Sequence, residues 1–383
     1  MADETDVLII GAGIIGLSCA VELAEAGRGV TVLDRHLPGA GQSTRTGGGI
    51  RLLHGTALLA ELSRRSLPTW EGFADRFGVD PQYRRTGHLF LTGRADGEAA
   101  LRAQAAGQRR AGVAVEVLEA EEIRRQWPYL AATRFTAGSY CGDGGWLDQH
   151  AVLHAYADAV TSRGAHLRPG VRVDGLVVEG GRVVGARTSH GTWRAGHVVN
   201  AAGPAAGMVA AMADVEIPFV SRWHQLLVVD PVPDVPQDLP WLIDVDRQVH
   251  LRPDGDGRAL VGGFLGVDEP TDPQRWTRDA DPAWVDAVRQ AASASFGVLP
   301  PDAPVVASWA GLYPGTADSL PVVEVSRPGL VTAAGFAGTG LMHAPAVGQL
   351  VVDLIEGRPL DLPEDLSRVR FEGPGVLPER TGF

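Results

Sequence analysis

The sequence predicts an α/β protein in which one domain is assembled from both ends of the chain and a second domain is a mainly antiparallel layer. Two observations predict this arrangement. A strand followed by a glycine-rich turn and a helix occurs near each end, at residues 6–26 and again at 330–355. Residues 215–311 instead alternate strand-like runs with turns rich in Pro and Gly. The chain of 383 residues is long enough for two such domains.

The first unit carries a glycine pattern that is typical of phosphate binding. An apolar strand leads into Gly11, Gly13 and Gly16; a helix follows, and a second strand ends at Asp34. Gly11 permits the tight turn, Gly13 lets the backbone approach a pyrophosphate, and Gly16 lets the helix pack closely on the strand. N–H groups at the helix start would face the phosphates, and Asp34 is placed to accept hydrogen bonds from ribose hydroxyls. These features predict a Rossmann-type domain that binds an adenine dinucleotide.

The next segment is expected to lead from this domain into the second one. Residues 39–51 form a polar, glycine-rich loop, which is either mobile or, as we expect, pressed against the dinucleotide. The pattern then predicts a helix over 56–78, a strand over 85–92 that leaves the first domain, and exposed helices over 98–111 and 119–127.

The remaining elements return the chain to the first domain twice. Asp148 is a candidate N-cap for a helix over 149–163, and Gly180-Gly181 predicts a hairpin within a β-meander over 171–199. A last helix at about 344–355 is expected to complete the dinucleotide domain. The predicted boundaries are 1–80, 142–214 and 312–383 for the dinucleotide domain, and 81–141 and 215–311 for the second domain.

Composition restricts the classes of protein to which the chain can belong. A net charge of −12 argues against nucleic acid and anionic membranes as partners, because both require basic surface. The chain has two cysteines and no lysine, so we expect no disulfide framework, Schiff base or lysine general base. The acidic N-terminus does not resemble a secretory signal, and no apolar run reaches the roughly 18 residues of a membrane span. No Cys/His grouping has metal-ligand spacing, and we expect a cytoplasmic enzyme without a metal.

Six blocks of sequence lie at residues 11–16 with Asp34, 43–51, 142–148, 199–204, 309–318 and 335–348. In this order they resemble the D-amino-acid oxidase superfamily of FAD-dependent oxidoreductases, most closely its sarcosine oxidase beta, glycine oxidase and proline dehydrogenase branch. The resemblance implies a Rossmann-type FAD-binding domain and a substrate domain built on a large mixed sheet. It also implies hydride transfer from the C–N bond of an amino acid or a secondary or cyclic amine to the flavin, giving an imine that hydrolyses.

The resemblance further implies where FAD lies along the chain. Small residues after Arg45 would follow the flavin, and Val173 would offer backbone groups to the adenine. Gly338, Thr339 and Gly340 precede a helix, so backbone N–H groups and the positive helix end can face the flavin edge that gathers negative charge on reduction. The predicted cofactor-binding residues are Gly11, Gly13, Ile14, Ile15, Gly16, Asp34, Ser43, Arg45, Thr46, Gly47, Gly48, Val173, Ala201, Ala202, Gly203, Gly311, Gly338, Thr339, Gly340, Leu341 and Met342, together with Arg35 unless it is simply exposed.

The sequence departs from the family pattern at three positions. Gly311 stands where relatives with covalently attached flavin carry a cysteine, so we expect FAD to be bound non-covalently. Tyr313 replaces the carboxylate-binding arginine of glycine oxidases, and Met342 replaces a lysine of monomeric sarcosine oxidases. The substrate is therefore expected to differ from glycine and sarcosine and to be a larger or cyclic amine.

Removal of hydride from an amine requires a neutral amine and a group that favours its deprotonated form. Histidine suits this task because its pKa lies near neutrality. His250, His343 and His54 are the catalytic candidates, and each could instead be a packed or surface histidine. The predicted substrate-binding residues are Arg51, Arg252, Tyr313 and Met342.

Two other functions remain open on the sequence alone. The chain could be the flavin subunit of a hetero-oligomeric amine dehydrogenase, or, on weaker grounds, an NAD(P)H-dependent hydroxylase or reductase. The second is disfavoured because no other strand-flanked Gly-x-Gly-x-x-Gly is present for NAD(P)H. Electrons would pass to oxygen or to another acceptor, and the oligomeric state is open.

Overall fold

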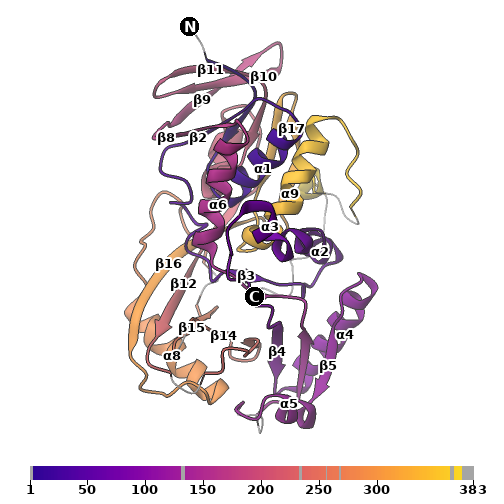
Figure 1. Cartoon of the computed structure of the whole chain (residues 1–383), viewed down its shortest axis with the longest axis vertical. Helices are drawn as coiled ribbons and strands as arrows, with labels where there is room; N and C mark the ends of the chain where they lie inside the picture. The colour runs from indigo at the N-terminus through magenta and orange to yellow at the C-terminus, as the bar shows by residue number, and fades with distance from the viewer. Residues whose placement is uncertain are drawn as a thin grey trace.

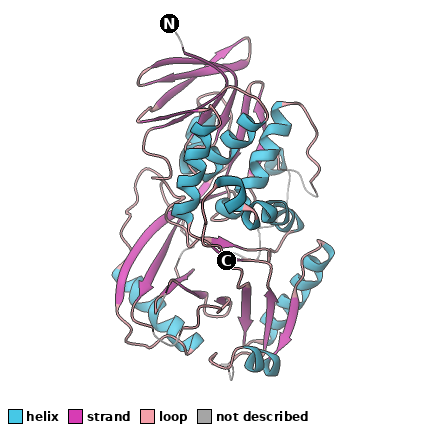
Figure 2. Ribbon diagram, in the orientation of Figure 1, coloured by secondary structure: helices cyan, strands magenta, loops and turns pink. Residues whose placement is uncertain are grey.

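The computed structural model describes residues 3–130, 134–232, 235–255, 257–266, 269–362 and 366–372. It contains two eight-stranded sheets, an upper and a lower one in the view of Figure 1, and a two-stranded ribbon of β3 (Gly49–Ile50) and β7 (Gly145–Trp146). Figure 2 shows the larger group of helices packed against the upper sheet and fewer helices beside the lower one. The predicted α/β class with a large mixed second sheet is confirmed.

The upper sheet has a parallel centre. β1 (Asp3–Ile10) lies between β2 (Val30–Asp34) and β11 (Gly191–Asn200), and all three strands run parallel. The path through the sheet is β17 (Val322–Arg327), β18 (Leu330–Ala334), β11, β1, β2 and β8 (His166–Pro169), and β9 (Val173–Glu179) and β10 (Arg182–Thr188) complete the predicted meander with β11. Both ends of the chain therefore contribute strands to one sheet.

Three helices cover one face of the upper sheet. α1 (Ile14–Glu25) packs against α6 (Gln149–Ser162) and against α9 (Gly340–Ile355) (Figure 1). α6 begins at the predicted N-cap, because the carboxylate of Asp148 accepts hydrogen bonds from the backbone N–H groups of His150 and Ala151. The short helix α7 (Ala206–Ala211) and the 3₁₀ turns η1 (Gly203–Ala205) and η2 (Arg368–Glu372) complete this part of the fold.

The helix predicted over 56–78 is two helices. α2 (Ala57–Glu71) ends at Gly72, and α3 (Phe73–Phe77) follows at once. Gly72 has ψ of 17°, outside the helical range, and glycine is a poor helix former, so the chain turns there. The prediction of one continuous helix was wrong at this residue.

The lower sheet is mainly antiparallel. Its order is β16 (Val305–Gly315), β12 (Val220–Val229), β15 (Ala259–Gly263), β14 (Val249–Pro253), β13 (Trp241–Asp244), β4 (His88–Thr92), β6 (Ala137–Cys141) and β5 (Glu116–Glu119). The pair β13 and β4 runs parallel. β16 continues to Gly315, so the predicted domain boundary at residue 311 falls inside a strand of this sheet.

Helices also cover the lower sheet. α4 (Ala95–Arg110) and α5 (Ala120–Gln126) occupy the segments predicted to be helical. α8 (Pro282–Phe296) was missed in a region predicted to hold strands and turns. Trp284, Val288, Ala292 and Phe296 repeat every four residues and are all buried, and this spacing was the available signal.

The described residues contain no helix that is both long enough and apolar enough to cross a membrane. Over the same residues, no group of three or more His, Cys, Asp or Glu side chains is placed to hold a metal ion. The two cysteines, Cys19 and Cys141, are buried and free.

Helices α1 and α9 approach each other closely at Gly348. A Cβ atom on Gly348 would lie 2.7 Å from Glu22 Cγ and 2.9 Å from Ser18 Oγ. We expect Gly348→Ala to lower the free energy of unfolding by about 1–3 kcal/mol, the usual cost of overpacking a buried contact. The matched control is Gly107→Ala in α4, where the nearest atom to the new Cβ is 3.8 Å away. That change should be neutral or stabilising by about 0.5–1 kcal/mol. Urea denaturation measures the free energy of unfolding of both variants. Equal stability of the two variants would contradict the close packing of α1 on α9 at Gly348.

Candidate active site

Two cavities adjoin where the sheets meet, and we name them the nucleotide channel and the inner cavity. The nucleotide channel encloses about 180 Å³ and passes Gly13, Asp34, Arg45 and Gly340. The inner cavity encloses about 570 Å³ and lies against the lower sheet. Six residues line both of them: Thr46, His224, Leu226, Tyr313, Ala337 and Gly338. A group bound in the channel can therefore reach a molecule in the inner cavity.

One end of the channel is the glycine motif after β1. Gly11 has φ of +109°, and a Cβ there would lie 2.4 Å from Ala201 O, so this turn requires glycine. The carboxylate of Asp34 accepts hydrogen bonds from Ala12 N at 2.7 Å and His36 N at 2.8 Å. These bonds hold the carboxylate at the end of β2, on the wall of the channel, where each oxygen can still accept a ribose hydroxyl.

The start of α1 forms the next part of the channel. Its N-cap is Gly13, which has no side chain to accept bonds from the first-turn N–H groups. Ser43 Oγ accepts the hydrogen bond of Ile14 N at 3.0 Å and so ties the polar loop to the helix. The loop is thus held beside the channel, as expected, and the positive end of α1 faces it.

Arg45 supplies a cation to the channel wall. Its guanidinium donates from Nη1 to Ala310 O at 3.3 Å, while its Nε is buried with no hydrogen-bond partner among the described residues. Burial, and then the charge of Arg278, lower the pKa of Arg45. A buried donor without an acceptor indicates that a ligand completes its hydrogen bonding.

The start of α9 forms the far end of the channel. The N-cap Thr339 donates its hydroxyl to Phe336 O and does not cap the helix, so first-turn N–H groups are left for a ligand beside Gly340 and Leu341. Gly338 has φ of +91°, and a Cβ there would lie 2.3 Å from the ring of Tyr313. A ribose acceptor, two helix starts and a half-buried arginine along one channel fit the parts of FAD.

The structure places most predicted cofactor residues on this channel. Gly47, Thr339 and Met342 line the inner cavity instead. Gly16 and Gly48 line neither cavity; each allows close packing, since an added Cβ would lie 1.9 Å from Gly11 O and 2.2 Å from Leu147 O, respectively. Val173 and the exposed Arg35 also lie outside both cavities. The channel-lining residues from the prediction are Gly11, Gly13, Ile14, Ile15, Asp34, Ser43, Arg45, Thr46, Ala201, Ala202, Gly203, Gly311, Gly338, Gly340 and Leu341.

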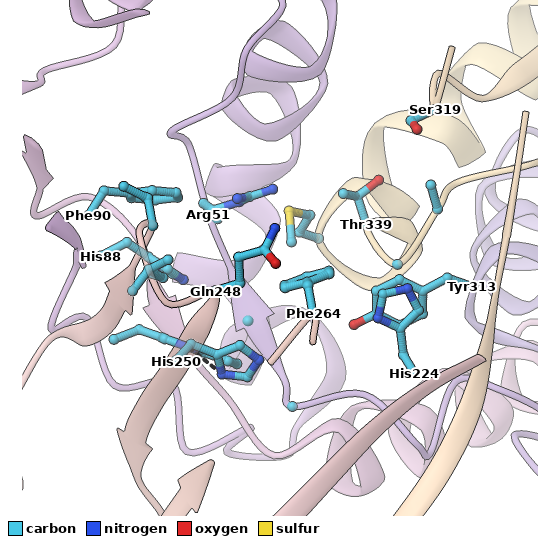
Figure 3. A pocket seen from close by; sticks show the side chains of 18 of the residues that line it. Arg51, His88, Phe90, His224, Gln248, His250, Phe264, Tyr313, Ser319 and Thr339 are labelled. Atoms are coloured by element: carbon cyan, nitrogen blue, oxygen red, sulfur yellow. Dashed lines mark hydrogen bonds between the residues drawn. The ribbon is translucent and has the colours of Figure 1, made fainter. Parts of the chain in front are cut away.

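The inner cavity is lined by alternate residues of several strands (Figure 3). β12 contributes Arg222, His224 and Leu226, and β4 contributes His88 and Phe90, because every second side chain of a strand faces the same side. The prediction found Arg51, His250, Tyr313 and Met342 on this cavity. It missed Arg222, His224, His88, Phe90, Trp241, Gln248 and Phe264. A predicted strand implies that every second side chain shares a face. The sequence did not indicate which face of the sheet lines the cavity.

The inner cavity is cationic. Arg51, whose exposed fraction is 6%, and Arg222 both line it. No Asp or Glu occurs among the described residues that line it, although the whole chain carries a net charge of −12. This charge distribution favours an anionic ligand inside the cavity.

The histidines of the inner cavity are neutral at physiological pH. Burial, followed by the charges of Arg222 and His250, lowers the pKa of His224 to about 3. Burial and then the charges of Arg252 and Arg51 lower the pKa of His250 to about 3. The pKa of His88 is likewise lowered well below its usual value, first by burial and then by Arg51.

The orientation of His250 is set by Trp241. The Trp241 Nε1–H group donates to His250 Nδ1 at 3.2 Å, so the neutral imidazole carries its proton on Nε2. The Nε2 atom lies over Gly262, where an added Cβ would be 2.4 Å away. His250 therefore lines the cavity, as predicted, but as a hydrogen-bond donor. This tautomer does not agree with the predicted role as a base.

His54 and His343 lie outside both cavities, contrary to their predicted catalytic contact. They are 1% and 0% exposed, respectively. His54 Nε2 lies 3.0 Å from Arg51 O and 2.9 Å from Ser63 Oγ, and Ser63 Oγ lies 3.0 Å from His343 Nε2. This buried chain of hydrogen bonds connects α2, α9 and the segment that carries Arg51. The two histidines hold these elements together.

Arg252 also departs from its predicted role in substrate binding. Its Nε donates to Gly47 O at 2.9 Å, and its Nη1 donates to Asp254 at 2.9 Å. The guanidinium lies 4.4 Å from the ring centroid of Trp146 and 5.5 Å from that of Trp241. These contacts direct the Nε and Nη1 groups of Arg252 to protein oxygens, and Arg252 supports the loop at Gly47 from behind.

Backbone strain gathers at the inner cavity. Five described residues other than glycine have positive φ, and three of them line this cavity: Gln248 at 55°, Ser319 at 61° and Ala337 at 47°. Such conformations cost of order 1–3 kcal/mol each and persist at sites where surrounding structure enforces them. Their position is consistent with a functional site.

Comparisons with known proteins agree with this geometry. A model of the family described as FAD dependent oxidoreductase matches residues 6–354. Glycine oxidase from Pseudomonas putida is 30% identical over 363 residues, which are 92% of this chain and 94% of the relative. The solved structure of L-proline dehydrogenase from P. horikoshii superposes with a TM-score of 0.88 at 27% identity, covering 97% of this chain and 99% of that one.

Some relatives are much longer. 4-Methylaminobutanoate oxidase (formaldehyde-forming) from Paenarthrobacter nicotinovorans is 27% identical over 379 residues, which are 92% of this chain and 44% of the relative. The chain spans about half the length of this relative and of mitochondrial dimethylglycine dehydrogenase from Rattus norvegicus. The family match, which extends through nearly all of the sequence, confirms the resemblance and the cofactor. This chain belongs to the FAD-dependent oxidoreductases of the D-amino-acid oxidase superfamily.

Proposed function

We propose that the chain oxidises the C–N bond of an amine or amino acid that carries a carboxylate. The observation that carries this proposal is the cationic inner cavity, which meets the nucleotide channel at Tyr313 and Gly338. The names of relatives, glycine oxidase and L-proline dehydrogenase among them, support a C–N bond as the site of reaction. The product is an imine, which water hydrolyses to a carbonyl compound and an amine or ammonia.

When bound, FAD supplies the hydride acceptor. Arg45, the start of α1 and the start of α9 would hold it in the channel. The positive end of α9 at Gly340 favours negative charge nearby, so this helix start stabilises electron-rich groups more than neutral ones. Cys19 and Cys141 are buried and line neither cavity, in support of non-covalent binding.

The inner cavity prepares the substrate in two ways. The Arg51 guanidinium binds the carboxylate and so positions the adjacent C–N bond. The cations of Arg51 and Arg222 also disfavour a positive charge on the amine, and no lining carboxylate among the described residues would favour it. The amine therefore loses its proton to solvent more readily in the cavity than in water. A histidine base is not required.

An anaerobic titration tests the proposal directly. The FAD-loaded protein is mixed with amino acids, N-alkyl amino acids and cyclic imino acids while its visible spectrum is recorded. We expect at least one carboxylate-bearing amine to bleach the flavin band, and readmission of air then separates an oxidase from a dehydrogenase. Bleaching by NAD(P)H and by none of the amines would overturn the proposal in favour of a reductase.

Removal of the Arg51 cation should lower the rate of the reaction, because the substrate carboxylate would lose the group that binds it. We expect Arg51→Met to lower kcat/KM for the active carboxylate by about 10–150-fold, the loss of one charge-assisted hydrogen-bonded contact. The carboxamide analogue lacks the anion that Arg51 would bind, so its kcat/KM should change little. The matched control is Arg125→Met in α5, an exposed arginine distant from the cavity. FAD content is measured for both variants. Equal losses for carboxylate and carboxamide would show that Arg51 does not bind the carboxylate.

The pH dependence of kcat/KM should be determined by the pKa of the substrate amine. Because His224 and His250 have pKa values of about 3, they stay neutral and give no limb between about pH 5 and 9. We expect kcat/KM to rise with pH through the pKa of the free amine and to shift when a substrate with a different amine pKa is used. In the complex, kcat should rise at a lower pH, because the cavity cations lower the pKa of the bound amine. A limb near pH 6–7 that is the same for all substrates would instead identify a histidine base.

A further inference from the structure

The inner cavity holds a second arginine, Arg222, to which the proposed reaction assigns no bound group of the substrate. Resting on the proposed function, we propose that the substrate bears two anionic groups, one bound by Arg51 and the other by Arg222. The substrate class is then an amine that carries two carboxylates. Arg222, which supplies the second cation, was not among the residues predicted from the sequence.

Arg222 is built into the cavity wall. It lies on β12 two residues before His224, and both side chains line the inner cavity. Across the sheet, Arg222 is paired with Tyr313 of β16. Its side chain is half-buried, and its guanidinium makes no hydrogen bond or ion pair with any described residue. A guanidinium carries five N–H donors, so a half-buried one without a protein acceptor is suited to an anion from outside.

The two arginines serve opposite ends of the cavity. In Figure 3, Arg51 lies with His88 and Phe90, whereas His224 and Tyr313, the neighbours of Arg222, lie at the other side. Beyond the effect of burial, Arg51 acts to lower the pKa of His88, of His250 and of Tyr313, whereas Arg222 acts to lower that of His224. The field of Arg51 therefore reaches Tyr313, and the separation of the two arginines rests on the placement of the side chains around them.

The space between these ends suits a substrate larger than glycine. A cavity of about 570 Å³ falls in the range that holds drug-sized molecules. Gln248 and Phe264 lie between the two ends in Figure 3, and they offer one amide and one aromatic surface to the middle of a ligand. With cations at both ends and no acid among the described lining residues, two carboxylates at the ends of one molecule are the complementary charge pattern.

A binding experiment on the FAD-loaded protein tests the second subsite without turnover. Malonate, succinate, glutarate and adipate are titrated against propionate, butyrate, valerate and hexanoate, and perturbation of the flavin band gives each Kd. We expect at least one dicarboxylate to bind roughly tenfold tighter or more than its monocarboxylate of equal carbon number, as for one added charge-assisted contact. In Arg222→Met this advantage should fall to less than about threefold, while the Kd of the monocarboxylate stays the same.

Three further variants make the result specific. Arg222→Lys, which keeps the charge but loses the forked geometry, should retain part of the advantage. Arg51→Met should weaken the binding of dicarboxylates and of monocarboxylates by the same factor. Arg125→Met removes the same charge far from the cavity and should retain the full advantage. Flavin content and the thermal unfolding midpoint show whether each variant is folded.

The outcomes separate this proposal from the proposed function. No dicarboxylate advantage in the unmodified protein, or an advantage that persists in Arg222→Met, overturns the second subsite. An equal loss in Arg125→Met also overturns it, because the effect would then be general attraction of anions. If a monocarboxylate amine bleaches the flavin and no dicarboxylate is preferred, the proposed function stands and the subsite fails. If the dicarboxylate advantage depends on Arg222 and no amine bleaches the flavin, the second subsite stands and the proposed function fails.

Discussion

Strand β16 is bonded on both sides to the loops that form the nucleotide channel. Leu312 N donates to Gln42 Oε1 at 2.7 Å, and Ala337 N donates to Pro314 O at 2.8 Å. These bonds join the lower sheet to the polar loop and to the turn before α9. A typical hydrogen bond contributes about 0.5–1.5 kcal/mol, so separation of the two sheets here would cost stability. The position of the inner cavity relative to the channel depends on this junction.

Tyr313 forms the common wall at the same junction. Its ring lies against Gly338, which has no side chain to displace it, and stacks on His224 with 3.8 Å between ring centroids. One aromatic side chain thus contacts the turn before α9 and the strand that carries Arg222. The absence of a Cβ at Gly338 makes room for the Tyr313 ring on the wall that the nucleotide channel and the inner cavity share.

The cationic cavity carries a cost in stability that the proposed function explains. Arg51 is nearly fully buried, and His88, His224 and His250 are kept neutral by burial and by nearby arginines. Two arginines line the cavity and its described lining includes no acid, and removal of charge from water is unfavourable. The family resemblance places cations of glycine oxidases and monomeric sarcosine oxidases at the positions of Tyr313 and Met342. The cavity cations of this chain, Arg51 and Arg222, lie on other segments, as the proposed arrangement of two carboxylates requires.

Local signals in the sequence were sufficient for the cofactor half of the site. The turn at Gly11 and the carboxylate of Asp34 depend on contacts within a strand, a turn and a helix, so spacing along the chain determined them. The last helix, predicted at about 344–355, begins earlier, at Gly340. The face that each residue of the lower sheet presents was decided by tertiary structure. Arg252 and Arg222 both lie on strands of that sheet, yet one supports a loop and the other lines the cavity. The reason is that register sets the direction of every side chain, and the partner of Arg222 is Tyr313, far away in the sequence.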